Sequence, residues 1–507
     1  MRKRVNLFLS LVLYIAFISS FVLLVFNYIA YSWIFLIIII SATILTGIII
    51  FITNRVESVK LSWIMVTLCL PILGIFLYWT FGRPYRYRKK QKAYLKVNNY
   101  FYEQEDWTFS KTSLNQENSN LDSDMLDLFR YTTRISHRPF YKNTNVQILS
   151  NGPKKFSQLF EDLSKAKTYI FINYFIIGEG ELLEVMLEIL KERIVAGIKI
   201  YIIYDAVGSY FSLSKYKIWK IKKMGIHFHK FSPVRLPFMT GTYNFRNHRK
   251  DIVIDGTIGY AGGINLSDNY IHLSAKYGFW RDTHIRIVGE AVKSIDLIFR
   301  QDWHFITGDI IDIAVKNPKV KIKNNIIVQV IDDGPVTKET IQKDLFIKFI
   351  SCAKARVWIS TPYLIPTSDL ITALRNSAYS GVDVRLTLPG ITDKCLSLDM
   401  SRTYYDSLIE AGVKIYEYNS VFNHSKSGIF DEHITIIGST NLDYRSLYSD
   451  HQTLVLVYDK KTNNDLKKQF EKDFTHSTLI KINPLMERSA FYRRVFLLLF
   501  RILAPLF

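Results

Sequence analysis

Two motifs in this 507-residue chain place the same side chains in the same order. Each motif holds a histidine, a lysine two residues later, an aspartate five residues beyond the lysine and an asparagine ten residues beyond that. The members are His248, Lys250, Asp255 and Asn265 in the first motif, and His424, Lys426, Asp431 and Asn441 in the second. A single short motif arises easily by chance. Two in register indicate a duplicated unit in which each half contributes one histidine and one lysine to a single site.

The side chains of these motifs suit the exchange of a phosphodiester without a metal ion. One imidazole can attack phosphorus and form a covalent phospho-histidine, which divides a difficult displacement into two easier ones. The second imidazole can protonate the departing alcohol and then deprotonate the incoming one. Two ammonium groups and two carboxamides can hold the phosphoryl oxygens as negative charge develops on them.

Strand periodicity separates the motif residues into two groups. In each motif the histidine and the lysine are two residues apart, so on a β-strand they would share one face. The aspartates, Asp255 and Asp431, have the opposite parity. We therefore expect both aspartates to point away from the phosphate and to act as supporting members of the catalytic set, which also contains the two histidines and the two lysines.

Each motif also predicts a β-hairpin, because apolar runs flank a two-residue turn signal. The first hairpin comprises residues 252–254, the turn Asp255-Gly256 and residues 257–261; the second comprises 428–430, 431–432 and 434–437. Both return strands end in small residues, Gly262-Gly263 and Gly438-Ser439. Glycine at such a position predicts a close approach of the backbone to a ligand.

The surrounding sequence alternates apolar strand runs with helical patterns. Strand, helix and strand are predicted at residues 169–175, 181–196 and 199–204, and again at 357–360, 368–380 and 384–388. Gly197 and Gly381 occupy the equivalent helix-to-strand junctions. The pattern predicts a duplicated α/β sandwich.

The paired motifs, with their GG-x-N and GS-x-N continuations, resemble those of the phospholipase D superfamily. The flanking segments narrow the resemblance to the bacterial cardiolipin synthases. These segments are Tyr243–Lys250, Trp280–His284, Thr361–Pro366, Gly381–Arg385 and Asn441–Ser446. The resemblance covers roughly residues 145–480 and implies a phospholipase D-type sandwich of two pseudo-symmetric halves that share one active site.

The resemblance also implies a reaction: phosphatidyl transfer between two phosphatidylglycerol molecules, giving cardiolipin and glycerol, with no metal or nucleotide cofactor. It implies that His248 is the nucleophile and His424 the acid and base. Phosphate binding is implied for Lys250, Lys426, Asn265 and Asn441. Four arginines could steer anionic headgroups or equally form a solvated face: Arg246, Arg249, Arg281 and Arg445.

This chain departs from the family at Gln452, where the family usually has a glutamate that holds the catalytic histidine of its own half. Asp282 matches that carboxylate for His248, so we expect His248 to keep an anionic partner while His424 faces a neutral amide. An amide oxygen can fix a tautomer but stabilises an imidazolium less than a carboxylate does. Asp450, two residues before Gln452, is a candidate to take over the role.

Charge and cysteine content restrict the partners. The formal net charge is +20, which suits an anionic partner surface, either nucleic acid or acidic lipid. The three cysteines, Cys69, Cys352 and Cys395, have neither metal-site nor disulfide spacing, and small buried apolar roles are expected for them.

The N-terminal region decides between these partners. Residues 5–27 and 33–52 are almost purely apolar and long enough to cross about 30 Å of hydrocarbon. A third stretch, residues 61–81, carries Pro71 and Gly74 at its centre. We therefore expect a multi-pass protein of the bacterial cell membrane, with phosphatidylglycerol as substrate, anionic lipids as partners and no nucleic acid.

Orientation depends on the third stretch. Basic residues lie before the first span, after the second span and at positions 83–92. If all three stretches cross, these clusters lie on both sides of the membrane, against the positive-inside tendency. If residues 61–81 are re-entrant, every cluster is cytoplasmic, and we favour this arrangement with the active site at the cytoplasmic face. Three crossings remain an alternative.

The predicted organisation has five parts. They are a membrane region at 1–82, a basic juxtamembrane segment and polar linker at 83–140, halves at 141–310 and 320–480, and a C-terminal amphipathic helix at 485–507. The last is apolar and arginine-rich, which favours a helix in the membrane interface over one docked on the protein's own core.

Three function classes remain open. The first is the lipid transferase; the second is a related enzyme, either a phospholipase D that uses water or a membrane-tethered nuclease. The third is a non-catalytic lipid-binding scaffold, for which Gln452 is the sole motive. Acyl-chain preference, other phosphatidyl donors and the oligomeric state are not set by the sequence.

Overall fold

The computed structural model describes residues 18–19, 32–53, 55–82, 94, 123–232, 245–273, 278–314, 322, 326–335, 337, 340–393, 396–419, 421–485 and 491–506. The chain divides into an N-terminal unit within residues 1–84 and a large unit within residues 85–505. The predicted first span at 5–27, apart from residues 18–19, lies outside the described residues, as do positions 83–92 and most of the predicted linker.

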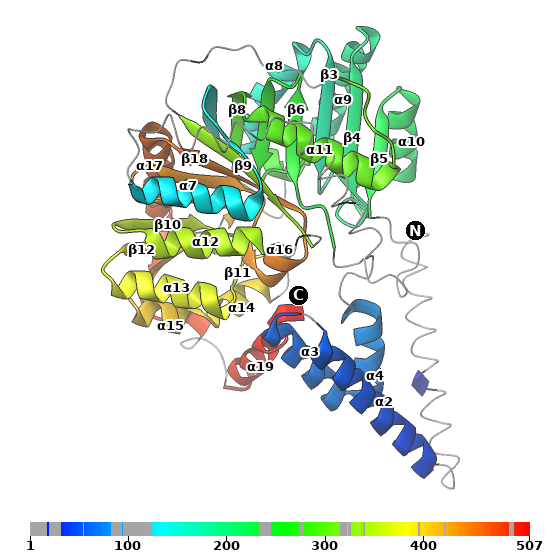
Figure 1. The fold of residues 1–507 in the computed structure, drawn as a ribbon, viewed down its shortest axis with the longest axis vertical. Coiled ribbons are helices and arrows are strands. Elements are labelled where there is room, and N and C mark those ends of the chain that lie inside the picture. Colours follow the sequence, from blue (N-terminus) through cyan, green and yellow to red (C-terminus); the bar gives the residue numbers. More distant parts are fainter. Residues whose placement is uncertain are drawn as a thin grey trace. The chain divides into compact units, whose positions relative to one another are not determined.

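The first sheet of the large unit is built around the first motif (Figure 1). Its strands run in the order β2-β8-β7-β6-β3-β4-β5. The bounds are β2 Thr144–Asn151, β3 Tyr169–Tyr174, β4 Lys199–Asp205, β5 His227–Phe231, β6 Lys250–Ile254, β7 Ile258–Gly262 and β8 Trp280–Gly289. Strands β6 and β7 form the predicted hairpin, and β6 runs antiparallel to β3, which places the start of β6 beside the carboxyl end of β3.

The second sheet repeats this strand order as β9-β18-β16-β15-β10-β12-β13, with β1 and β19 added at its edges. The bounds are β1 Phe140–Tyr141, β9 Ile327–Asp333, β10 Arg356–Ser360, β12 Asp383–Pro389, β13 Lys414–Tyr418, β15 Ser427–Phe430, β16 Ile434–Gly438, β18 Gln452–Tyr458 and β19 Ser477–Ile480. The hairpin predicted for the second motif is β15 and β16.

Helices cover both sheets, and their ends follow the local sequence. They include α8 Gly152–Ser164, α9 Glu181–Val195, α10 Lys215–Lys223, α11 Val292–Thr307, α12 Ile341–Cys352, α13 Ser368–Tyr379 and α17 Lys460–Thr475. After α9 and α13 the chain turns at Gly197 and Gly381, whose φ angles of 84° and 87° favour glycine. The predicted junction role of both glycines is confirmed.

A hydrophobic core joins the two sheets. Phe171, Phe299 and Trp303 of the first half pack in one cluster with Val330 and Val455 of the second. Separate clusters fill the outer layer of each sheet. Burial of this continuous apolar surface stabilises the large unit as one body.

Two segments depart from the predicted boundaries. Helix α7 (Ser123–Ser136) and strand β1 fall inside the predicted linker, yet they belong to the second half: Leu128 and Phe129 pack in its outer core, and β1 pairs with β9. Strand β14 (Phe422–Asn423) comes from the second half and pairs with β8 of the first sheet. In each case the segment is placed by contacts with residues far away in the sequence, and local amino-acid composition does not predict such contacts.

Within the described part of the N-terminal unit, one helix has membrane-spanning length, α2 (Ser32–Ile52), as predicted for residues 33–52. The third apolar stretch is not one continuous helix. It consists of α3 (Glu57–Cys69), α4 (Pro71–Leu77) and a π-helical turn, η2 (Tyr78–Gly82). Pro71 cannot continue the hydrogen-bonded ladder of α3, so the helix breaks before it.

After this break the chain folds back on itself. A Cβ at Gly74 would lie 2.4 Å from the carbonyl oxygen of Val66, so only glycine lets the two helices approach this closely. The guanidinium of Arg55 donates to the carbonyl of Gly82 at 2.8 Å. Residues 55–82 therefore form a hairpin whose two ends lie together.

Candidate active site

The two motif histidines lie at the carboxyl ends of β3 and β10, and the backbone of each is bound by the opposite half. The N–H of His248 donates to the carbonyl of His451 at 2.9 Å, and the N–H of His424 donates to the carbonyl of Arg281 at 2.7 Å. Because these bonds cross between the halves, the position of each histidine depends on both sheets.

His248 faces two neutral hydrogen-bond acceptors. Its Nδ1 lies 3.0 Å from the carbonyl oxygen of Ser439 and 3.0 Å from Oε1 of Gln452. The Ser439 hydroxyl donates to the same Oε1 at 2.6 Å, which fixes the orientation of the amide. A carbonyl oxygen can only accept, so Nδ1 carries the proton and Nε2 keeps its lone pair. The ring of Phe175 packs edge-on against the imidazole at 4.9 Å.

His424 faces a carboxylate. Its Nδ1 lies 2.7 Å from Oδ2 of Asp282, and both side chains are buried. The rings of Tyr270, Trp280 and Phe422 surround the imidazole at centroid distances of 5.6 to 5.8 Å. This wall excludes water, so the charge-assisted bond to Asp282 is stronger than it would be in solvent.

The pairing expected from the sequence is wrong. Asp282 holds His424, and Gln452 holds His248, so each orienting residue serves the histidine of the other half. The physical reason is that each histidine is held at the joint between the sheets, where β14 pairs with β8 and Asn247 bridges to His451. Proximity in sequence therefore does not identify the partner.

The motif lysines and asparagines lie beside the histidines. The ammonium of Lys250 donates to the carbonyl of His248 at 2.5 Å, and that of Lys426 donates to the carbonyl of His424. Asn265 accepts from the N–H of Ile176 at 3.0 Å and is buried. Asn441 is also buried, and among the described residues its Oδ1 has no hydrogen-bond partner.

Burial and crowded positive charge lower the pKa of both imidazoles. The pKa of His248 is well below its usual value because of burial and then the charges of Lys250 and Lys426. Burial and Lys426 lower the pKa of His424 to about 4, although Asp282 opposes the shift. The pKa of Lys250 is lowered by burial and by Lys426. The charge of Lys426, from the second motif, thus acts on His248 and Lys250 of the first.

The motif aspartates lie away from this site. Asp255 accepts from the backbone N–H groups of Lys167 and Thr168 at 2.8 and 2.6 Å. Asp431 accepts from those of Ala355 and Arg356 at 2.7 and 3.0 Å. Both sit in the hairpin turns at positive φ, 55° and 51°. Their position agrees with the expectation that they point away from the phosphate, and in none of the described bonds does either aspartate contact a histidine.

Three of the four arginines considered for headgroup steering are buried in internal ion pairs. Arg246 pairs with Asp205 at 3.7 Å, Arg249 with Asp302 at 2.6 Å and Arg281 with Asp473 at 2.8 Å. These three side chains are buried, so they neither steer headgroups nor form a solvated face. A guanidinium group removed from water needs an internal partner, which the three aspartates supply. Arg445 is partly exposed.

Asp450 does not take over from the missing glutamate. It binds Arg445 at 3.3 Å and the backbone N–H of Arg246 at 3.3 Å. His424 already has Asp282, so no second carboxylate is required there.

The two glycines before Asn265 pack closely against side chains behind the site. A Cβ at Gly263 would lie 2.1 Å from Oδ1 of Asp282, and one at Gly262 would lie 2.6 Å from Nδ1 of His284. These glycines therefore make room for the residues behind the site. The contacts of Ser439 and Phe175 with the surroundings of His248 were not predicted from the sequence. Ser439 is part of the second motif, whereas no sequence signal identifies Phe175.

Comparison with known proteins shows the class to which the chain belongs. A family model described as "Cardiolipin synthase, PLD-like domain" matches residues 346–474, and one described as "Phospholipase_D-nuclease N-terminal" matches residues 33–83. A phosphatidylserine synthase from Haemophilus influenzae shares the fold, with a TM-score of 0.58 at 14% identity over 75% of this chain and 100% of that one. The chain is thus a phosphatidyltransferase of the phospholipase D type.

Curated relatives define the family more narrowly. A cardiolipin synthase of Halalkalibacterium halodurans is 37% identical over 463 residues, 91% of each chain. One of Alkalihalophilus pseudofirmus is 35% identical over 476 residues, 92% of each chain. The protein belongs to the bacterial cardiolipin synthase family.

Proposed function

We propose that the protein transfers a phosphatidyl group from one phosphatidylglycerol to another, giving cardiolipin and glycerol through a phospho-histidine at His248. The observation that carries this proposal is the hydrogen bonding of the two imidazoles: each Nδ1 faces an acceptor, so each Nε2 is available for chemistry. The family supplies the substrate class.

The proposed reaction has two balanced steps. First, Nε2 of His248 attacks phosphorus, the bond from phosphorus to the headgroup glycerol oxygen breaks, and His424 donates its proton to that oxygen. Second, His424 removes the proton from the terminal hydroxyl of another phosphatidylglycerol, whose oxygen attacks phosphorus and releases His248. The phosphoryl oxygens are held throughout by Lys250, Lys426, Asn265 and Asn441.

The unequal partners of the histidines support this division of roles. A nucleophile must be unprotonated, and the neutral Gln452 and Ser439 acceptors do little to stabilise an imidazolium at His248. A general acid must carry a proton, and the Asp282 carboxylate stabilises the imidazolium of His424. Burial and Lys426 oppose that proton, and an anionic phosphodiester bound between the lysines would offset them in favour of the imidazolium.

The two sheets support a duplicated catalytic fold with one shared site. Seven strands follow the same order in both, and the motif histidine precedes the equivalent strands β6 and β15. We propose that residues 141–310 and 320–480 are pseudo-symmetric halves, with α7 and β1 added to the second.

The hairpin of the N-terminal unit supports a re-entrant segment. Helix α3 has 13 residues, and at 1.5 Å per residue it rises about 20 Å, less than the ~30 Å of a hydrocarbon core. Because Arg55 and Gly82 meet, residues 55–82 would enter and leave on the same face. With α2 and the first apolar stretch as spans, the basic clusters then share the cytoplasmic side, where we place the active site.

The C-terminal helix α19 (Phe491–Arg501) has one side docked on the protein's own core and another side that is apolar and exposed. Leu497 is fully buried against Met400 and Leu485, whereas Phe491, Tyr492 and other apolar side chains are exposed. We propose that the helix is docked along one line and presents its remaining apolar surface to the membrane interface.

The decisive experiment follows both ends of the substrate. The purified full-length protein is incubated in mixed micelles without divalent cations, with phosphatidylglycerol labelled in its acyl chains and its terminal glycerol. We expect equal release of cardiolipin and glycerol, abolished by His248→Ala and by His424→Ala. Phosphatidic acid in place of cardiolipin would indicate a hydrolase and would refute the proposal, as would a phospho-enzyme mapped to His424.

A further inference from the structure

The first half carries an exposed surface that the proposed reaction does not use. It consists of α10 and the loop before it, residues 206–214, and we call it the α10 surface. Four aromatic side chains on it are exposed by 45 to 85%: Tyr210, Phe211, Tyr216 and Trp219. Large aromatic groups at such exposure mark a contact surface when they lie together.

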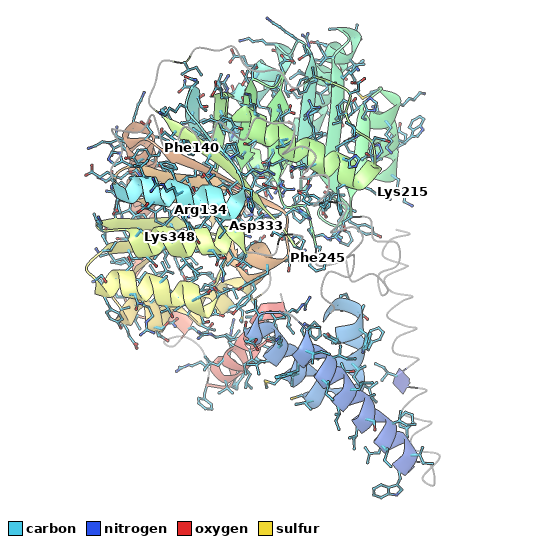
Figure 2. All side chains as sticks on the ribbon, viewed as in Figure 1. Arg134, Phe140, Lys215, Phe245, Asp333 and Lys348 are labelled. Atoms are coloured by element: carbon cyan, nitrogen blue, oxygen red, sulfur yellow. The ribbon has the colours of Figure 1, made fainter. Side chains whose placement is uncertain are left out.

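The aromatic residues of α10 share the outward face of the helix with lysines. Lys217 and Ile221 point inward and are buried. Tyr216 and Trp219 are stacked with a centroid distance of 6.1 Å, and the ammonium of Lys223 lies 5.0 Å from the Trp219 ring. Lys215, Lys220 and Lys222 are also exposed, and α10 contains no acidic residue. Figure 2 shows Lys215 at the outer margin of the large unit, beside the edge strand β5.

The acidic side chains bonded to this surface are engaged away from its exposed lysines, and Glu179 accepts from the backbone N–H of Ser214. Glu184 of α9 is bonded to Lys217, which lies on the buried side of α10. Among the residues that the structure describes, no ion pair holds the exposed lysines of α10, so this face combines aromatic rings with exposed ammonium groups. Aromatic rings favour the interfacial layer of a bilayer, and lysines favour its anionic headgroups.

The α10 surface is connected to the His248 side of the active site. The hydroxyl of Ser209 in its loop donates to the carbonyl of Phe175 at 3.1 Å and accepts from the N–H of Ile177 at 3.0 Å. Gly208 lies so close that a Cβ there would be 2.4 Å from the Phe175 carbonyl. The ring of Phe175 in turn contacts His248 and lies under the ammonium of Lys250 at 5.2 Å.

We propose that the α10 surface is a membrane-contacting element that seats the first half on an anionic phospholipid bilayer next to His248. Its aromatic side chains enter the interfacial layer, and its lysines bind the headgroup phosphates. Lipid substrate then passes from the bilayer to Nε2 of His248 over a short distance. The inference rests on the proposed lipid-transfer function, and the charge of α10 favours a bilayer over an apolar protein partner.

A fluorescence experiment tests the contact without requiring activity. An environment-sensitive probe is attached to Phe211→Cys in the full-length chain with its three native cysteines replaced by serine, and the protein is reconstituted in vesicles of phosphatidylglycerol and phosphatidylcholine. We expect a blue-shifted emission and quenching by lipids that carry a spin label near the headgroup. Val195→Cys, 86% exposed on the neighbouring helix α9, is the matched control and should show neither effect. An unshifted, unquenched probe at position 211 would overturn the proposal.

A second experiment separates membrane contact from catalysis. Phe211→Ser with Trp219→Ser, and separately Lys220→Gln with Lys223→Gln, should each lower transfer in vesicles at least about fivefold, the factor expected for one lysine near an anionic surface. Transfer of short-chain phosphatidylglycerol in detergent micelles should be unchanged. Equal losses in both assays, or no loss in vesicles, would refute the α10 surface, whereas a wild-type protein inactive in micelles would refute the proposed function itself.

Discussion

At the scale of single residues, the two imidazoles differ in what holds Nδ1: an amide and a backbone carbonyl at His248, a carboxylate at His424. If Asp282 acts through the imidazolium of His424, Asp282→Asn should slow transfer from phosphatidylglycerol about 100-fold or more. It should have little effect on a phosphatidyl ester of p-nitrophenol, a leaving group that departs without a proton. The rates of the two substrates are compared at one pH. Equal losses would show that Asp282 merely maintains structure.

The amide at His248 leads to a prediction about pH. Gln452→Glu would place a carboxylate 3.0 Å from Nδ1, and an anion raises the pKa of a neighbouring imidazole. His248 attacks only when unprotonated, so a higher pKa leaves it protonated up to a higher pH. The acid limb of the pH profile for phospho-enzyme formation should therefore move to higher pH. An unchanged acid limb would show that the residue at position 452 does not influence the pKa of the nucleophilic histidine.

At the scale of elements, Gly263 at the end of β7 is needed for the His424–Asp282 pair. Gly263→Ala would place a methyl group 2.1 Å from the carboxylate and displace it. We expect the variant to reproduce the substrate dependence of Asp282→Asn, with a selective loss for the glycerol leaving group. Full activity toward phosphatidylglycerol would show that Asp282 can hold His424 from another position.

The N-terminal hairpin makes a prediction about sidedness. In inside-out and right-side-out membrane vesicles, cysteines at Glu57→Cys and Arg86→Cys should react with an impermeant reagent from the same side. Trp33→Cys, at the opposite end of α2, should react from the other side. Labelling of positions 57 and 86 from opposite sides would mean that residues 61–81 cross the membrane.

The sequence predicted the local elements well and the pairing between halves poorly. The hairpins, the junction glycines and the turn aspartates follow from signals a few residues long, which local sterics decide. The partners of His248 and His424, and the placement of α7 and β1, depend on contacts between residues more than a hundred positions apart. A single sequence carries no signal for such contacts, so Asp282 was assigned to the wrong histidine although both residues had been identified.

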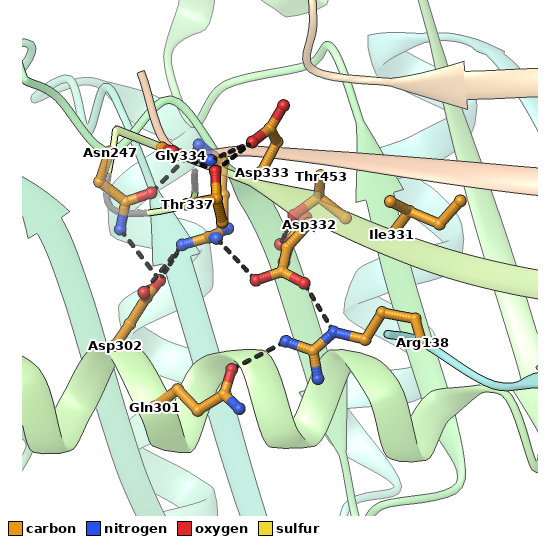
Figure 3. Close-up of polar contacts among 12 residues, drawn as sticks. Arg138, Asn247, Gln301, Asp302, Ile331, Asp332, Asp333, Gly334, Thr337 and Thr453 are labelled. Atoms are coloured by element: carbon orange, nitrogen blue, oxygen red, sulfur yellow. Dashed lines mark hydrogen bonds and ion pairs between the residues drawn. The ribbon is translucent and has the colours of Figure 1, made fainter. Parts of the chain in front are cut away.

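At the scale of the whole molecule, a buried ion network joins the two halves (Figure 3). Arg249 binds Asp302 of α11 at 2.6 Å and Asp332 of β9 at 3.4 Å, and Arg138 binds Asp332 at 2.6 Å and Gln301 at 2.9 Å. These charges are out of water, so removing one leaves its partners uncompensated.

The network predicts a large stability cost for one substitution. Arg249→Met should lower the free energy of unfolding by about 3–5 kcal/mol. Arg130→Met removes the exposed pair with Asp127 on α7 and should cost less than about 1 kcal/mol. The midpoints of thermal unfolding, followed by circular dichroism, compare the two variants. Similar midpoints would show that the joint between the halves depends on its apolar core alone.

Each histidine is oriented by a residue of the other half, and this arrangement affects how the two histidines can become different during evolution. In a homodimer with the same geometry, every substitution appears twice, so both histidines would gain or lose a carboxylate together. In a single chain the symmetry can be broken one residue at a time, and the change at position 452 alters the reactivity of the histidine encoded 204 residues earlier. A single chain thereby allows one imidazole to specialise in bonding to phosphorus and the other in moving protons, a specialisation closed to two identical subunits.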